Sequence, residues 1–169
     1  GTVVATIGNT GLGAVDPLPG LLKLQQKYPF RLHADAAYGG YFGLASELQT
    51  DTAAAYAALR DVDSIVIDPH KHGLQPYGCG CVLFKDPSVG SFYKHGSPFT
   101  YFSSAELHLG EISLECSRPG ASAVALWATQ KMLPLQRGGE FAAMLDQCLL
   151  AAREFWQRLR DSGNYVPLM

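Results

Sequence analysis

The chain has 169 residues, of which 47% are hydrophobic and 17% charged, a composition typical of one folded unit with an ordinary core. Its formal net charge is −2, its pI is about 6.2 and it has no basic run, so nothing indicates a nucleic-acid or membrane-surface partner. No stretch approaches the roughly 20 apolar residues that a transmembrane helix needs.

The first residues predict a strand followed by a helix. Residues 2–7 are apolar and rich in β-branched side chains, which favours a buried strand. Asp16 followed by Pro17 is typical of a helix start, with Asp16 as the N-cap. Leucines and a tyrosine within 21–28 give this helix one apolar face, and Pro29 ends it.

Three more strands are expected before residue 88. Residues 30–34 form the second, an alanine-rich helix follows near 52–60, and the third strand spans 64–67. A polar loop alone separates the third strand from a fourth at 80–84, so these two need not be parallel. The alternation of strands and helices predicts an α/β fold with a mostly parallel sheet flanked by helices.

The pattern changes in the second half of the chain. Residues 88–119 are rich in Ser, Gly, Tyr and Phe without a sustained period, as in long functional or mobile loops. We predict either a lid or dimer-contact loop that excludes water from a site, or an ordered connection packed on the core. One helix is expected from residue 121 to Pro134, and a second over about 140–160.

The chain contains four cysteines, Cys79, Cys81, Cys116 and Cys148. Cys79 and Cys81 are too close in sequence for a usual zinc or redox CxxC pair, and we predict no metal site. We interpret the four as buried free thiols in a reducing compartment, which fits a cytoplasmic protein. Residues 1–7 also lack the basic flank and the length of a secretion signal.

Two ionisable residues are expected at one edge of the sheet. Asp35 follows the second strand directly, and Lys71 follows the third. Ligands of open α/β sheets bind beyond the carboxyl ends of the strands, so both side chains could contact a ligand. From position alone, a simple ion pair between Asp35 and Lys71 is an equally open interpretation.

The residues around Asp35 and Lys71 carry more information than position. Four motifs occur in order: TIGNTG with GAVDP at 6–17, HADAAYGG at 33–40, DPHK at 68–71 and SRPG at 117–120. In this order and spacing they cover most of the chain and resemble the group II pyridoxal-phosphate decarboxylases, a family that includes aromatic-amino-acid, tyrosine and glutamate decarboxylases.

The resemblance implies a fold and a domain division. The fold would be that of the aspartate-aminotransferase-like, fold type I, pyridoxal-phosphate-dependent transferases. Residues 1–133 would be the C-terminal half of the large cofactor-binding domain, and 134–169 a connecting helix and the start of the small C-terminal domain. The family's phosphate-binding loop and ring-stacking histidine precede the matched region, and no methionine starts the chain. We therefore expect a piece of a longer polypeptide that is inactive alone.

The resemblance also implies roles for the central residues. Lys71 would hold pyridoxal 5′-phosphate as a Schiff base. Asp35 would face the ring nitrogen, where a carboxylate keeps the proton that makes the ring an effective electron sink. Ala37 would pack on one face of the ring. His70 would lie near the cofactor phosphate, or alternatively serve as a structural histidine at the strand end.

Further residues complete the implied site. Thr6 and Asn9 match a turn near the cofactor, although the family usually has threonine where this chain has Asn9. Tyr77 follows a proline, as in the tyrosine-decarboxylase branch, and would line the active site as a proton donor or pocket wall. Its alternative is a core tyrosine. Arg118 would hold a carboxylate or form a structural ion pair.

The function implied is a carboxy-lyase. It would decarboxylate an L-amino acid, aromatic and tyrosine-like, to an amine and carbon dioxide, with pyridoxal phosphate as cofactor and as a homodimer. The alternatives are a glutamate or other acidic or diamino substrate, a related carbon–carbon lyase or aldehyde-forming reaction, and an inactive fragment.

Overall fold

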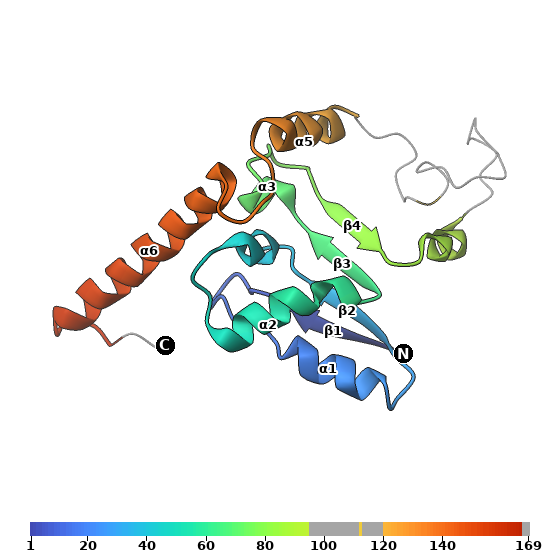
Figure 1. The fold of residues 1–169 in the computed structure, drawn as a ribbon, viewed down its shortest axis with the longest axis horizontal. Helices are drawn as coiled ribbons and strands as arrows, with labels where there is room; N and C mark the ends of the chain where they lie inside the picture. The colour runs from blue at the N-terminus through green and yellow to red at the C-terminus, as the bar shows by residue number, and fades with distance from the viewer. Residues whose placement is uncertain (95–111, 113–119, 167–169) are drawn as a thin grey trace.

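The computed structural model describes residues 1–94, 112 and 120–166 (Figure 1). Within them, one sheet has the strand order β1-β2-β3-β4. Its strands are β1 (Thr2–Thr6), β2 (Arg31–Asp35), β3 (Ser64–Ile67) and β4 (Cys81–Phe84). The first three are parallel, and β4 is antiparallel to β3. The predicted α/β fold with a mostly parallel sheet is confirmed.

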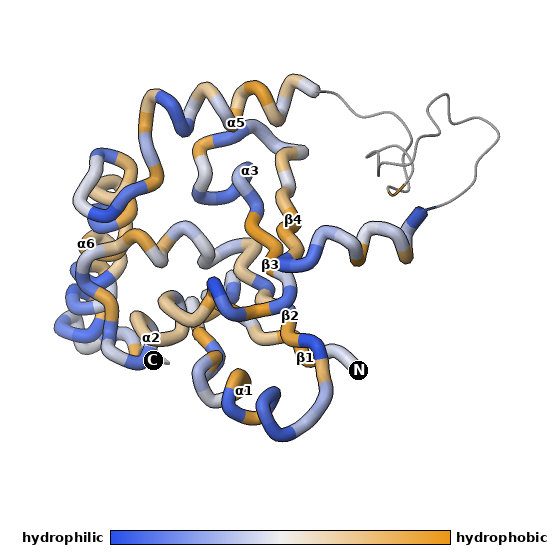
Figure 2. The backbone as a smooth tube through the Cα atoms, turned by 45° about the vertical axis from the view of Figure 1, so that its right-hand side comes forward, coloured by the Kyte–Doolittle hydropathy of each residue, from blue (hydrophilic) through white to orange (hydrophobic). Residues whose placement is uncertain are grey.

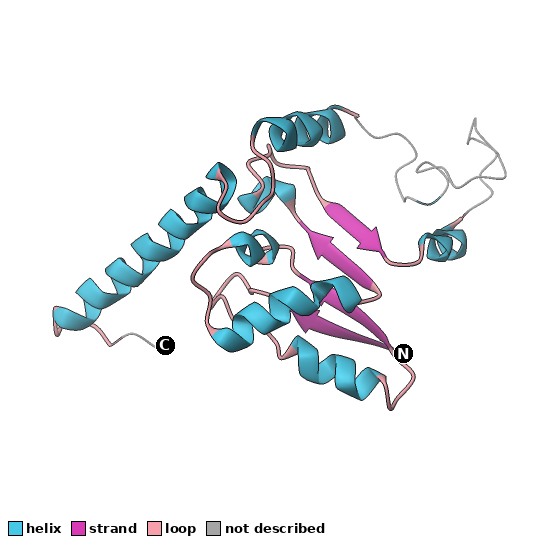
Figure 3. Cartoon of the chain, viewed as in Figure 1, coloured by secondary structure: helices cyan, strands magenta, loops and turns pink. Residues whose placement is uncertain are grey.

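Two helices cover one face of this sheet. α1 (Leu18–Gln25) and α2 (Thr50–Ala58) lie against each other, and α1 packs on β2 (Figures 1 and 3). Alternate strand residues point into the core between these layers, because side chains alternate along a strand: Ala5, Ile7, Leu32, Ala34 and Ala36 are all buried there. Val4 points the other way and is 57% exposed. The first strand is expected to be buried, but only the side chains on one of its faces are.

Short helical turns follow the strands and helices of this core. η1 (Gly40–Leu44) follows β2, η2 (Leu59–Asp61) extends α2, the one-turn helix α3 (Pro69–His72) follows β3, and η3 (Pro87–Tyr93) follows β4. Because β2 and β3 are parallel, η1 and α3 begin at the same edge of the sheet (Figure 3). That edge is where the sequence predicts the ligand site.

The two C-terminal helices lie outside the sheet layers. α5 (Ala121–Met132) and α6 (Glu140–Asp161) match the predicted pair. The start of α6 packs on η1 through Phe141 and Leu145, which contact Tyr41. Its far end extends away from the sheet and carries many hydrophilic residues, in contrast to the hydrophobic β3 and β4 (Figures 1 and 2). No helix in the described part of the chain is long and apolar enough to cross a membrane.

The predicted N-cap of α1 is wrong. The capping position is Pro17, and no side chain caps the helix. The carboxylate of Asp16 instead accepts a hydrogen bond from the backbone N–H of Thr6 at 2.7 Å, while the Asp16 N–H donates to the Thr6 carbonyl at 2.9 Å. Asp16 therefore fastens the start of α1 to the end of β1.

The expectation of buried cysteines holds only in part. Cys79, Cys81 and Cys148 are free thiols, but only Cys79 is buried, whereas Cys81 is half-buried and Cys148 exposed. Cys116 lies outside the described residues. So do Arg118 and most of the predicted lid. Its first residues, 88–93, belong to η3, in which Phe92 is 81% exposed.

Candidate active site

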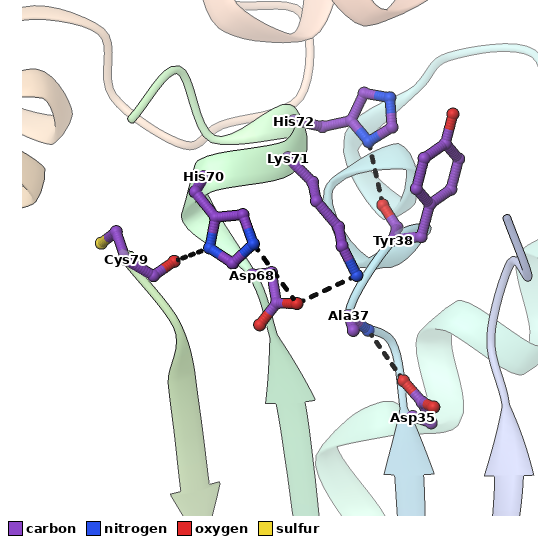
Figure 4. A network of polar contacts seen from close by, with 8 residues as sticks. All are labelled: Asp35, Ala37, Tyr38, Asp68, His70, Lys71, His72 and Cys79. Carbon is purple, nitrogen blue, oxygen red and sulfur yellow. Dashed lines mark hydrogen bonds and ion pairs between the residues drawn. The ribbon is translucent and has the colours of Figure 1, made fainter. Parts of the chain in front are cut away.

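The loops that carry the two central motifs are joined by backbone hydrogen bonds. The Asp68 N–H donates to the Ala37 carbonyl at 3.1 Å, and the Ala36 N–H donates to the Val66 carbonyl at 3.1 Å. These contacts continue the β2–β3 pairing, in which Asp35 lies opposite Val66. The two motifs therefore share the carboxyl edge of the sheet (Figure 4), as predicted.

Asp35 is the last residue of β2 and is half-buried. Its Oδ1 accepts a hydrogen bond from the backbone N–H of Ala37 at 3.2 Å. An ionised carboxylate has room for about four hydrogen bonds. Asp35 therefore keeps acceptor capacity for a positively charged group or an N–H donor of a ligand.

Lys71 lies in the one-turn helix α3 rather than directly on the strand. Its Nζ lies 3.0 Å from Oδ2 of Asp68, and the Lys71 side chain is 32% exposed against 18% for Asp68 (Figure 4). The ion pair with Asp35 that position alone allowed is thus wrong in the described structure, because Asp68 takes that place. The Lys71 side chain is therefore not sealed in the core, although its amine is engaged by a carboxylate.

His70 links α3 to the segment before β4. Its Nδ1 lies 2.6 Å from the carbonyl oxygen of Cys79, so this nitrogen carries the proton and donates. Its Nε2 lies 3.9 Å from Oδ2 of Asp68. His70 therefore ties α3 to the segment before β4, and its second nitrogen faces the carboxylate that also binds Lys71. Its predicted place near the cofactor phosphate stays a prediction.

Tyr77 is 94% exposed, so the alternative of a core tyrosine is wrong. Its ring lies edge-on to His70, with 5.4 Å between ring centroids and 62° between planes. The phenol therefore stands beside the histidine of the DPHK motif. Its predicted role in the active site stays a prediction.

The turn after β1 lies next to Asp35. Thr6 is opposite Asp35 in the parallel pairing of β1 with β2. Oδ1 of Asn9 accepts a hydrogen bond from the backbone N–H of Leu12 at 2.7 Å. Asn9 therefore stabilises its own turn, and the amide nitrogen is the part of its side chain left to donate to a cofactor hydroxyl.

Two glycines allow these loops to touch. Gly8 has φ +79°, and a Cβ at this position would lie 2.7 Å from Cα of Gly39. A Cβ on Gly39 would lie 2.4 Å from the carbonyl oxygen of Ile7. Below them, the buried hydroxyl of Tyr56 donates to the Gly39 carbonyl at 2.7 Å, and burial raises the pKa of Tyr56 to about 12.

Three groups around Lys71 were missed by reasoning from the sequence. Asp68 pairs with the amine, and its i,i+3 spacing from Lys71 in a helical turn is a signal that could have revealed it. Nδ1 of His72 lies 3.0 Å from the Tyr38 carbonyl oxygen, which ties α3 to the loop after β2. Burial, Cys79 and Asp68 together raise the pKa of the Cys81 thiol, which therefore stays protonated at neutral pH.

Residues 2–166 match the family model described as the pyridoxal-dependent decarboxylase conserved domain. The chain belongs to the pyridoxal-dependent decarboxylase family. The predicted family is therefore confirmed, and so is the cofactor, pyridoxal phosphate, that gives the family its name. Lys71 and Asp35 lie within the matched residues, at the sheet edge where their motifs meet.

Individual relatives show how much of the family this chain represents. An L-tyrosine decarboxylase of Enterococcus faecium is 28% identical, covering 94% of this chain and 31% of the relative. A probable L-aspartate decarboxylase of Pyrococcus furiosus is 32% identical, covering 95% of this chain and 42% of the relative. Mouse CSAD in apo form, at 24% identity, has a TM-score of 0.79 over 99% of this chain and 34% of that chain, which confirms fold type I. The chain thus spans well under half the length of these relatives.

Proposed function

We propose that the protein containing this chain is a pyridoxal-phosphate-dependent decarboxylase of an L-amino acid. The observation that carries the proposal is the placement of the Lys71 amine and the Asp35 carboxylate on hydrogen-bonded loops at one edge of a parallel sheet. The alternative of an inactive fragment applies to the isolated chain, which covers 31% and 42% of two relatives.

The chemistry of the donor set fits the cofactor. Lys71 supplies a primary amine for the aldehyde carbon, Asp35 a carboxylate with spare acceptor capacity, and Ala37 a side chain small enough for a ring to lie against. The bound cofactor would supply an acceptor for the electron pair that stays on the α-carbon when the substrate carboxylate is released as carbon dioxide. Asp35 favours this chemistry because its negative charge holds a proton on the ring nitrogen.

The residues around Lys71 and Asp35 have supporting tasks in this proposal. Asp68 holds the Lys71 amine at the sheet edge. His70 would lie near the cofactor phosphate, and its Nδ1 also ties α3 to the segment before β4. The exposed Tyr77 phenol would return a proton to the α-carbon or form a wall of the substrate site. Thr6 and the Asn9 amide would contact the cofactor from the turn after β1.

We propose an aromatic, tyrosine-like substrate. Support comes from the Pro76-Tyr77 pair after the lysine, and from relatives named L-tyrosine decarboxylase in Enterococcus faecium and Levilactobacillus brevis. An acidic substrate is the second candidate, favoured by a relative of Pyrococcus abyssi named probable L-aspartate decarboxylase at 36% identity. Release of carbon dioxide from L-tyrosine, L-aspartate and L-glutamate by the full-length protein separates the two.

Residues 1–133 would be the C-terminal half of the large domain, and 134–169 the connecting helix and the start of the small domain. The bend between α5 and α6, and the course of α6 away from the sheet, support this division (Figure 1). By the family resemblance we also expect a homodimer in the cytoplasm. Light scattering on the full-length protein measures its mass, and cell fractionation its location.

The decisive experiment locates the cofactor. The full-length protein is incubated with pyridoxal phosphate, reduced with borohydride and mapped by peptide mass spectrometry. We expect the pyridoxyl group on Lys71 and none in Lys71→Arg, which keeps the positive charge beside Asp68 but lacks a reactive primary amine. A pyridoxyl group mainly on Lys23, Lys85 or Lys131 would contradict the proposal.

A further inference from the structure

The chain turns sharply after Lys71. Gly73 is buried, and a Cβ at this position would lie 2.4 Å from the hydroxyl oxygen of Tyr41, so a larger residue does not fit. Leu74 has φ 58°, a left-handed conformation that residues with a side chain rarely adopt. The Leu74 side chain is 54% exposed, so its own packing does little to hold this conformation.

The side chain of Gln75 holds the turn from inside. Its Nε2 donates to Oγ1 of Thr129 at 2.8 Å, to the Leu74 carbonyl at 3.1 Å and to the Gly73 carbonyl at 3.3 Å. Its backbone N–H donates to the carbonyl of Pro69, the first residue of α3, at 3.2 Å. Gln75 therefore connects the start of α3, the turn after α3 and the helix α5.

The orientation of the amide follows from these partners. Two carbonyl oxygens lie within hydrogen-bond distance of Nε2, and a flipped amide would bring its oxygen against both of them. Gln75 is 8% exposed, and its Oε1 has no hydrogen-bond partner among the described residues. A buried amide oxygen without a partner is unfavourable, so the contacts of Nε2 are what offset the burial of this polar group.

We infer that Gln75 is a positioning residue for Lys71 and acts through its hydrogen bond to Thr129. A helix of four residues has too few internal hydrogen bonds to hold its own direction. The strand β3 fixes the start of α3, and the Gly73–Gln75 turn fixes its end. Fixing that turn against α5 therefore sets the direction in which α3 presents the Lys71 amine. The effect of Gln75 on cofactor attachment rests on the proposed function, whereas its effect on the geometry of the turn does not.

The test uses the full-length protein and two readouts. The first is amide hydrogen exchange of the 69–78 segment without cofactor, and the second is the rate at which pyridoxal phosphate becomes attached to Lys71, trapped by borohydride. Thr129→Val removes the acceptor with little change of volume, and Gln75→Leu removes the amide. We expect each to speed exchange in 69–78 roughly tenfold and to slow attachment by a similar factor. Exchange in β1 and β2 should stay unchanged.

The controls separate positioning from general destabilisation. Thr129→Ser keeps the hydroxyl and should behave as wild type in both readouts. Gln130→Leu changes the exposed neighbouring glutamine of α5 and should also leave both unchanged. The double variant of Gln75→Leu with Thr129→Val should be no worse than Gln75→Leu alone, because one interaction cannot be lost twice.

Two outcomes would overturn the inference: wild-type exchange and attachment in Thr129→Val, or additive effects in the double variant. If Gln75→Leu does not fold, the comparison of Thr129→Val with Thr129→Ser still decides. If the wild-type protein attaches no cofactor at Lys71, the proposed function fails, and the exchange readout still tests the contact between Gln75 and Thr129.

Discussion

Replacing Gly39 by alanine should loosen the contact between the loops after β1 and β2. The added Cβ would lie 2.4 Å from the Ile7 carbonyl oxygen and 2.6 Å from Cα of Gly8, both backbone atoms. Neither atom is free to move. The Ile7 N–H donates to the Asp35 carbonyl at 2.8 Å, and the Gly8 N–H donates to Ala14 at 3.0 Å. The two loops must therefore separate.

The size of the effect follows from two opposing terms. Overpacking of this kind costs about 1–3 kcal/mol. Gly39 has φ −84° and ψ −10°, which alanine adopts easily. Alanine also restricts the unfolded chain more than glycine does, and this stabilises the folded state by about 0.4–1 kcal/mol. The net loss should lie between about 0 and 2.6 kcal/mol, with a central value of about 1.3 kcal/mol. The strain falls on the loop that carries Ala37, so cofactor attachment should slow as well.

The assay is urea unfolding of the full-length protein, with Gly20→Ala as the matched control. Gly20 lies in α1, and a Cβ there would meet nothing within 4 Å, so alanine should stabilise by up to about 1 kcal/mol. Glycine-to-alanine substitution is thus expected to lower the free energy of unfolding at position 39 and to raise it at position 20. If Gly39→Ala unfolds at the same or a higher urea concentration than Gly20→Ala, the steric reasoning is refuted.

Three further substitutions test the site. Asp35→Asn should still attach pyridoxal phosphate at Lys71 while kcat falls roughly a hundredfold or more, because the ring nitrogen loses its counter-charge; near-normal kcat would exclude the role. Asp68→Asn should change the free energy of unfolding by less than about 1 kcal/mol, because the ion pair with Lys71 is partly exposed. It should nevertheless slow the attachment of pyridoxal phosphate to Lys71 several-fold. A larger loss of stability would contradict this reasoning. Tyr56→Phe should cost about 1 kcal/mol by removing the bond to Gly39. Because burial raises the Tyr56 pKa from 10.0 to about 12, wild-type stability should be full below pH 10 and fall towards pH 12, and Tyr56→Phe should show less of this fall.

The strands and the site edge could be predicted because their signals are local. Runs of β-branched residues indicate β1 and β3, and the strand–helix alternation indicates parallel pairing, which places Asp35 and Lys71 at one edge. The segment between β3 and β4 has only the four-residue helix α3 and no long crossover helix, so it does not require a parallel pair, and β4 is antiparallel.

Contacts between distant segments could not be predicted from the sequence. Asp16 looks like an N-cap locally, but the Thr6 N–H, ten residues earlier, competes for its carboxylate. The amide of Gln75 reaches Thr129 in a helix 54 residues away. The exposure of Tyr77 depends on which segments pack around it, and this packing cannot be predicted from the spacing or the composition of the sequence. The pairing of Lys71 with Asp68 is, by contrast, a local contact, because the two residues are three apart in one helical turn.

The two carboxylates at the sheet edge are suited to different tasks. Oδ2 of Asp68 lies 3.0 Å from Nζ of Lys71 and 3.9 Å from Nε2 of His70. The negative charge of Asp68 is therefore largely compensated by the Lys71 ammonium in the same loop. Asp35 receives the neutral N–H of Ala37, so its charge is available to a ligand. If Lys71 paired with Asp35 instead, attaching a cofactor would require breaking that pair before the ring nitrogen could approach. Pairing with Asp68 leaves the Asp35 carboxylate unpaired by Lys71. Under the proposed function, one sheet edge would thereby supply both the attachment point for the cofactor and the counter-charge for its ring nitrogen.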